Sequence, residues 1–169
     1  MTTSDAIGNR HGSAVVTLPS DTEILISRQF DAPAELVFEA YTTPELVKRW
    51  WGFETSEWLV CEIDLRVGGM WRYVTREEGG FEVAFHGEYR ELEAPHRLVS
   101  TEVYEGAPVP DASGTLNIVT LDEADGVTTM TVLVQAPSQE VRDAILESGM
   151  EGGMQISYDR LEDLVRSRT

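Results

Sequence analysis

The residues of this sequence best suited to chemistry are aromatic and methionine side chains that recur at strand or helix spacing. Trp71 and Tyr73 are two positions apart and Phe85 and Tyr89 four apart, so each pair lies on one face of a strand, where alternate side chains point the same way. Aromatic rings and methionine suit adaptable packing around an apolar molecule. The candidate ligand-binding residues are Trp51, Trp71, Tyr73, Phe85, Tyr89, Met130, Val132, Met154 and Tyr158. The same side chains would also serve an ordinary packed core.

The sequence offers little for metal binding or covalent catalysis. His11, His86 and His96 are scattered, and the single cysteine, Cys61, has no histidine at motif spacing. Metal sites usually need such clusters, and the glycine motifs of nucleotide sites and the serine-centred elbow are absent too. We therefore expect no metal and no cofactor, and assign no catalytic residue.

Acid–base chemistry has only tyrosines to draw on within the candidate set. An enzyme needs a positioned acid or base, and Tyr73, Tyr89 and Tyr158 are the polar members of the set. Arg72 and Arg90 have the opposite strand parity, so we expect both to face solvent. This favours binding over catalysis and leaves the question of an enzyme open.

The composition is strongly acidic, with 30 Asp and Glu against 13 Lys and Arg and a formal net charge of −17. This charge repels phosphates and anionic lipids over a Debye length of about 8 Å at physiological salt, so we expect no nucleic-acid partner. The chain lacks an apolar stretch of roughly 20 residues and a signal-peptide pattern, and we expect no membrane insertion. A lone cysteine favours the reducing cytoplasm. The acidity suits solubility, or docking to a basic partner.

The periodicity predicts one α+β domain over residues 21–169, preceded by a disordered or loosely held tail over residues 1–20. A strand over 23–30 is followed by two short helices before Trp51. An antiparallel meander then runs to Gln135, and a helical pattern ends the chain. Its apolar stripe must lie against the sheet. We expect six to seven strands in total.

Two local clusters carry structural alternatives. Trp50, Trp51 and Trp58 place three indoles within nine positions, which suggests either a lid or packing of the helix pair. Gly149 and the pair at 152–153 interrupt the last helical pattern. They either let the helix bend at the mouth of a cavity or separate a short helix from a long one. We favour the second interpretation.

Four segments resemble one known superfamily in their order and separation. They read "ISRQFDAPAELVFEAYTTPELVKRWWG", "EIDLRVGGMWRYV", "FHGEYRELEAPHRLVSTE" and "GGMQISYDRLEDLV", and with their spacers they cover residues 23–166. The chain resembles the START-like superfamily, also called the helix-grip or SRPBCC fold. Within it, the chain resembles the branch named after the C-terminal domain of the heat-shock-protein-90 ATPase activator. The resemblance implies a curved antiparallel sheet around a long C-terminal helix.

The resemblance also implies a deep cavity between the sheet and that helix, which other members use for lipids, hormones, polyketides and aromatic intermediates. We therefore expect a small hydrophobic molecule as the partner, held without a defined reaction. Two alternatives stay open, a polyketide cyclase or aromatase-like enzyme and a chaperone-docking module related to the activator. The sequence leaves the ligand and the oligomeric state undetermined, with a homodimer as one option.

Overall fold

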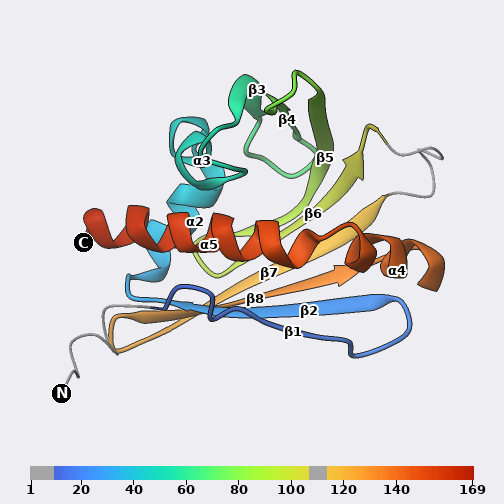
Figure 1. Ribbon diagram of the computed structural model, residues 1–169. Coiled ribbons are helices and arrows are strands. Elements are labelled where there is room, and N and C mark those ends of the chain that lie inside the picture. Colours follow the sequence, from blue (N-terminus) through green and yellow to red (C-terminus); the bar gives the residue numbers. More distant parts are fainter. Residues whose placement is uncertain (1–9, 107–113) are drawn as a thin grey trace.

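The computed structural model consists of one antiparallel sheet wrapped around a long helix, and it describes residues 10–106 and 114–169 (Figure 1). The strands are β1 (Val15–Thr17), β2 (Glu23–Phe30), β3 (Glu57–Ile63), β4 (Met70–Arg76), β5 (Glu82–Glu93), β6 (Arg97–Tyr104), β7 (Thr115–Ala124) and β8 (Val127–Gln135). The helices are α2 (Ala34–Thr42), α3 (Pro44–Trp50), α4 (Gln139–Glu147) and α5 (Met150–Ser167). The α+β class and the helix-grip architecture are confirmed.

Local sequence signals explain where the helices begin and end. Pro44 is the first residue of α3, where a fixed φ and a missing N–H cost nothing. Ser138 caps α4 by accepting a hydrogen bond from the Val141 backbone N–H at 3.2 Å. Gly149 then adopts φ 81° between α4 and α5, a left-handed conformation that only glycine takes at little cost. The prediction that a glycine separates two helices here is confirmed.

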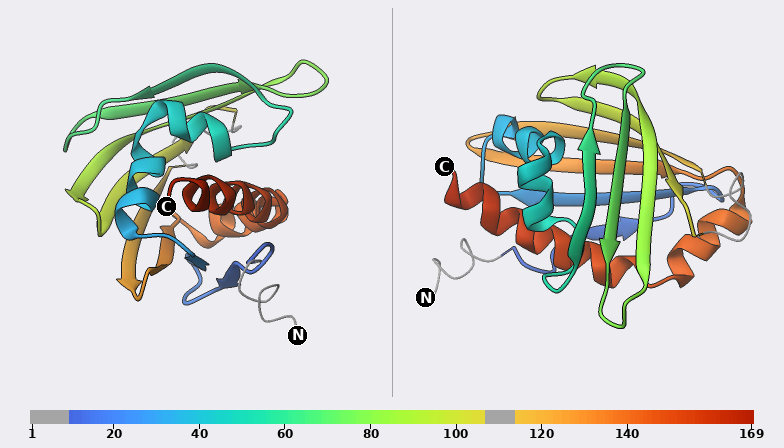
Figure 2. Two further views of the ribbon diagram at one scale, coloured as in Figure 1. Left: turned by 90° about the vertical axis from the view of Figure 1, so that its left-hand side faces the viewer. Right: turned by 90° about the horizontal axis from the view of Figure 1, so that it is seen from above.

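The strands follow the order β1-β2-β8-β7-β6-β5-β4-β3, and every neighbouring pair is antiparallel. Strands β3 to β8 are therefore a meander, as predicted, and β2 returns to pair with β8 along its whole length. Figure 2 shows the sheet curving round α5, so that β3, β4 and β5 cross over the side of the helix opposite β1 and β2.

The backbones of β5 and β6 approach each other closely at Gly87. The ladder pairs His86 with Val103 and Tyr89 with Ser100. Between these two pairs, the Glu88 backbone N–H donates to the Thr101 hydroxyl and not to a backbone carbonyl. A Cβ on Gly87 would lie 1.8 Å from the Thr101 carbonyl oxygen. Only a glycine lets the two backbones approach this closely.

Helix α5 is fastened to the sheet by an apolar stripe and a buried ion pair. Leu161 and Val165 are fully buried in the core. The Arg28 guanidinium of β2 lies 2.8 Å from the Glu162 carboxylate and 3.1 Å from that of Asp159. Buried charges of this kind are stable only when paired. These ion pairs therefore tie α5 to β2. In the described part of the chain, no helix is long and apolar enough to cross a membrane.

The segment expected as a loose tail contains a strand. Val15 pairs with Ser27 and Thr17 with Leu25, and the Gln155 side chain of α5 bonds to both the N–H and the carbonyl of Ala14. Over the described residues, the sheet therefore has eight strands. The expectation over residues 1–20 is corrected for these positions because the edge of β2 offers backbone partners that local periodicity does not encode. Residues 1–9 lie outside the described part.

Candidate functional site

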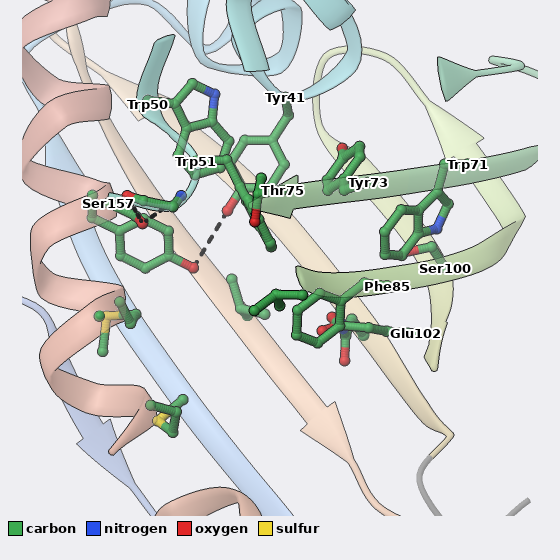
Figure 3. A pocket seen from close by; sticks show the side chains of 18 of the residues that line it. Tyr41, Trp50, Trp51, Trp71, Tyr73, Thr75, Phe85, Ser100, Glu102 and Ser157 are labelled. Carbon is green, nitrogen blue, oxygen red and sulfur yellow. Dashed lines mark hydrogen bonds between the residues drawn. The ribbon is translucent and has the colours of Figure 1, made fainter. Parts of the chain in front are cut away.

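A cavity of about 500 Å³ lies between the inner face of the sheet, the helix pair α2–α3 and α5. Figure 3 shows side chains from all of these elements pointing into one space, among them Tyr41 and Trp51 from the α2–α3 region, Tyr73 from β4 and Phe85 from β5. The volume is within the roughly 300–1,000 Å³ of small-molecule pockets. The core of this domain is therefore not closed.

Eight of the nine candidate residues line this cavity: Trp51, Trp71, Tyr73, Phe85, Tyr89, Val132, Met154 and Tyr158. Met130 does not. It has the same parity on β8 as Val132 but pairs with Arg28 and Leu121 in the closed part of the core, where it is fully buried. Strand parity gives the face of a residue but not its position along that face, so Met130 is corrected to a core residue.

Trp51 is the centre of the aromatic wall. Its ring centroid lies 5.2 Å from that of Tyr73, 5.6 Å from Phe85 and 5.5 Å from Trp58. The Tyr73 and Phe85 contacts are edge-to-face, the arrangement that ring quadrupoles favour. Figure 3 shows Trp71 beyond Tyr73 on the same strand, with their centroids 4.7 Å apart. These rings pack against one another and form one continuous aromatic wall.

The other two indoles of the Trp50–Trp58 cluster have packing roles. Trp50 is buried, and its Nε1–H donates to the Ala40 carbonyl at 2.9 Å, which ties α3 to α2. Trp58 contacts Trp51 and Tyr73 from β3. The helix-pair interpretation therefore accounts for Trp50, and Trp58 supports the aromatic wall from behind.

The mouth of the cavity lies between the loop after α3, the β4–β5 turn and the start of α5. Phe53 and Phe81 both line the cavity while remaining 47% and 60% exposed. Gly153 lines it too, and a Cβ there would meet the Phe53 ring at 3.8 Å. Two exposed phenyl rings thus border the opening.

Four tyrosines place neutral hydroxyl groups in the cavity. Tyr41 donates a hydrogen bond to the Tyr158 hydroxyl at 3.3 Å, which is the dashed line that starts from the Tyr41 hydroxyl in Figure 3. Burial raises the pKa of Tyr158 to about 12, and burial also raises the pKa of Tyr41, Tyr73 and Tyr89. All four remain protonated at physiological pH and can donate or accept hydrogen bonds there.

Glu102 is a carboxyl group inside the cavity that the strand pattern did not single out. It lies on β6, and its Oε1 accepts a hydrogen bond from Asn117 Nδ2 at 2.6 Å. The Thr115 hydroxyl in turn donates to Asn117 Oδ1 at 3.0 Å, which fixes the amide. Burial raises the pKa of Glu102, and the Asn117 hydrogen bond lowers it by less. The alternation of Leu98, Ser100 and Glu102 could have identified this inner face.

A second carboxyl group, Glu77, lines the cavity near the exposed Phe81. The Thr75 hydroxyl donates to its Oε2 at 2.6 Å, and Ser56 Oγ lies 2.8 Å from its Oε1. These hydroxyls hold the carboxylate at the end of β4. Glu77 is not among the candidate residues because it follows a strand and precedes a glycine turn, where an acid usually faces solvent.

The groups expected outside the site lie outside it. Arg72 faces outward and makes a two-point bond with the Glu105 carboxylate, which also contacts His86 at 2.9 Å. Burial raises the pKa of Cys61 to about 11, so its thiol is not a reactive thiolate. Within the described ranges, no three His, Cys, Asp or Glu side chains gather in a way that could hold a metal ion.

The family model described as "Activator of Hsp90 ATPase homolog 1-like protein" matches residues 31–166. Among solved structures, a protein from Rhodobacter sphaeroides has 26% identity and a TM-score of 0.83, covering 91% of this chain and 98% of that one. A protein from Arthrobacter aurescens has 25% identity and a TM-score of 0.80, covering 90% and 91%. An HSP90 activator from Plasmodium falciparum, at 18% identity and a TM-score of 0.63 over 85% and 95%, shares the fold alone. No curated protein matches the chain.

Proposed function

The chain belongs to the family described as activator of Hsp90 ATPase homolog 1-like protein, and we propose that it encloses a small hydrophobic or aromatic molecule between the sheet and α5. The observation that supports this is the hollow of about 500 Å³ between the sheet and α5, whose lining includes ten aromatic side chains. Protein interiors otherwise pack as densely as organic crystals. An apolar molecule that filled the hollow would recover the contacts the wall lacks.

We propose binding rather than turnover because the polar groups of the cavity do not form a reactive pair. The Tyr41 and Tyr158 hydroxyls bond to each other, and Glu102 bonds to the amide of Asn117. A nucleophile held against a general base is the usual sign of covalent catalysis. The Thr75 hydroxyl does donate to the Glu77 carboxylate, but the same carboxylate also binds the Ser56 hydroxyl, and together they fix the end of β4. The hydroxyls of the wall suit the orientation of a bound molecule instead.

The neutral aromatic dye N-phenyl-1-naphthylamine tests this function. We expect its fluorescence to rise on binding with saturation at one dye per chain and a dissociation constant on the order of 10–100 µM. The Ser100→Phe variant fills the space opposite Tyr89 and should weaken binding at least tenfold. Fluorescence titration of both proteins measures the difference.

The matched control is Ala124→Phe, which adds the same ring at the exposed end of β7. It should bind the dye as the unmodified protein does. Far-ultraviolet circular dichroism shows that each variant is folded. Saturable binding that survives Ser100→Phe unchanged, or a lack of saturable binding to the unmodified protein, would overturn the proposal.

The family description favours docking to a chaperone as a second function. The exposed Phe53 and Phe81 at the mouth offer apolar contacts for such a partner. If the protein docks to a chaperone, we expect it to raise the ATPase rate of a purified Hsp90. The double variant Phe53→Ser, Phe81→Ser should remove the increase. An unchanged ATPase rate at saturating protein would exclude it for that chaperone.

A further inference from the structure

Among the described residues, the charged side chains of the cavity wall are all acidic. Its lining residues, all in the described part of the chain, include the carboxyl groups of Glu77 and Glu102 but no Lys, Arg or His. Neither carboxyl group takes part in any ion pair found within residues 10–106 and 114–169. The wall therefore disfavours anions and leaves room for a positive charge.

Two arginines on the elements that surround the cavity bind groups other than its two carboxyl groups. The Arg28 guanidinium pairs with Glu162 and Asp159 beneath α5. Arg160 donates to the backbone carbonyls of Arg49 and Gly52 at 3.0 Å each. Neither guanidinium contacts Glu102, so neither neutralises it.

Glu102 is flanked by aromatic rings. Because Phe85 pairs with Tyr104, Glu102 is its diagonal neighbour on the inner face, and Figure 3 shows the carboxyl group beside the Phe85 ring. On β4, Trp71 is the ladder partner of Gly87 on β5. Its indole fills the space that a side chain at Gly87 would occupy. Ring faces attract cations, and they do so more strongly away from water.

The two carboxyl groups differ in how completely they are bonded. Glu77 is held by Ser56 and Thr75 through both of its oxygens. Among the described residues, Glu102 is held through Oε1 alone, and its other oxygen keeps its bonding capacity for a guest. Glu77 also lies beside the exposed Phe81 at the mouth, where water screens its charge.

We propose, building on the ligand-binding function above, that the cavity accepts an organic ammonium ion with an aromatic or aliphatic body, and that the Glu102 carboxylate is its counter-ion. The apolar body packs against Trp51, Tyr73 and Phe85, while the ammonium group donates to the free oxygen of Glu102. Burial raises the pKa of this carboxyl group, and a bound ammonium ion would favour its ionised form by supplying the opposite charge. The net charge of −17 draws cations toward the molecule from solution.

Three probes of equal length test the charge preference: 4-(4-biphenylyl)butylammonium, the corresponding alcohol and the corresponding butanoate. Titration calorimetry at pH 8, where the amine is still a cation, gives the three dissociation constants. We expect the ammonium to bind at least tenfold more tightly than the alcohol, and the butanoate to bind more weakly than both. This order of the three dissociation constants tests the charge preference in the unmodified protein alone.

Glu102→Gln then locates the counter-ion, because it removes the charge and keeps an oxygen that can accept from Asn117. In this variant the ammonium and the alcohol should bind within about threefold of each other. The control Glu62→Gln removes the same charge from an exposed position on β3 and should retain the tenfold preference. Thermal unfolding confirms that both variants are folded.

The outcomes separate this inference from the function on which it rests. Alcohol binding as tight as that of the ammonium in the unmodified protein overturns the charge preference and leaves the ligand-binding function intact. A preference that survives in Glu102→Gln but is lost in Glu77→Gln overturns the assignment of the counter-ion. Failure of all three probes to bind contradicts the ligand-binding function, and the present inference with it.

Discussion

Among single side chains, Glu102 is the one on which the proposed charge preference of the cavity depends. A carboxyl group among aromatic rings is costly to ionise because burial penalises the charged form. Asn117 offsets part of that cost through its 2.6 Å hydrogen bond. The hydroxyls of Tyr41, Tyr73 and Tyr158 share this environment, and burial keeps them neutral. Burial therefore raises the pKa of Glu102, and the Asn117 hydrogen bond lowers it by less.

The stability of the protein should depend on pH through Glu102. Its pKa is raised in the folded state and ordinary in the unfolded state, so the folded protein holds the proton more tightly. The stabilising effect is complete below the unfolded pKa and is lost as pH rises through the folded pKa. Glu102→Gln cannot ionise, so we expect it to unfold at a higher temperature than the unmodified protein at pH 8 and to lose that advantage near pH 4.

Scanning calorimetry of both proteins at the two pH values measures this difference. Glu62→Gln serves as the control, since Glu62 is exposed on β3. A difference between Glu102→Gln and the unmodified protein that is the same at pH 4 and pH 8 would show that Glu102 does not titrate abnormally.

Among the elements, the curved strands β4 and β5 give the cavity its shape. They pass over α5 on the side opposite β1 and β2 (Figure 2), and Trp71, Phe85 and Tyr158 line the same hollow. At Gly87 the Thr101 carbonyl of β6 occupies the space of a side chain, so the two strands lie close together there. A flat sheet would leave α5 in contact with β2 and β8 and would enclose no space.

Gly87→Ala should therefore destabilise the protein by about 3 kcal/mol, because its Cβ would overlap the Thr101 oxygen and the Trp71 Nε1. The control is Gly152→Ala in the first turn of α5, where a Cβ meets no atom within 4 Å. It should stabilise the protein by about 0.5–1 kcal/mol through helix propensity. Urea unfolding followed by circular dichroism measures both changes. Equal effects of the two substitutions would contradict the role given to Gly87.

On the scale of the whole molecule, electrostatic repulsion opposes folding. The 30 acidic residues outnumber the 13 basic ones, so most carboxylates cannot be paired. Some surface pairs do form, and the pKa of Glu105 is lowered to about 2 by its hydrogen bonds with Arg72, with His86 contributing less. Such exposed pairs contribute little stability, and they leave the net repulsion in place.

Sodium chloride should consequently stabilise the protein at pH 7. Raising its concentration from 0.05 to 0.5 M shortens the Debye length, and we expect stabilisation of about 1 kcal/mol, or about 2–4 °C in the unfolding temperature. Near the isoelectric point of about 4.4 the net charge vanishes, and the effect of salt should be much smaller. Thermal unfolding at the two pH values tests this. Salt that destabilises the protein at pH 7 would mean that attractive pairs dominate.

Much of this architecture is encoded locally. Alternation along the strands placed Trp71, Tyr73, Phe85 and Tyr89 on the inner side, and Pro44 marked the start of a helix, because side-chain period and backbone restriction act within a few residues. The aromatic composition of the hollow followed from these positions.

Other features exist only once distant segments meet. The three-residue strand β1 depends on the free edge of β2, and the environment of Glu102 depends on Asn117, fifteen positions away on β7. Met130 and Val132 have the same parity, yet only Val132 reaches the cavity, because the curvature of the sheet decides where packing closes. Periodicity indicates which face of a strand or helix each residue lies on. The cavity depends instead on the distance between the curved sheet and α5. That separation is a property of the assembled fold.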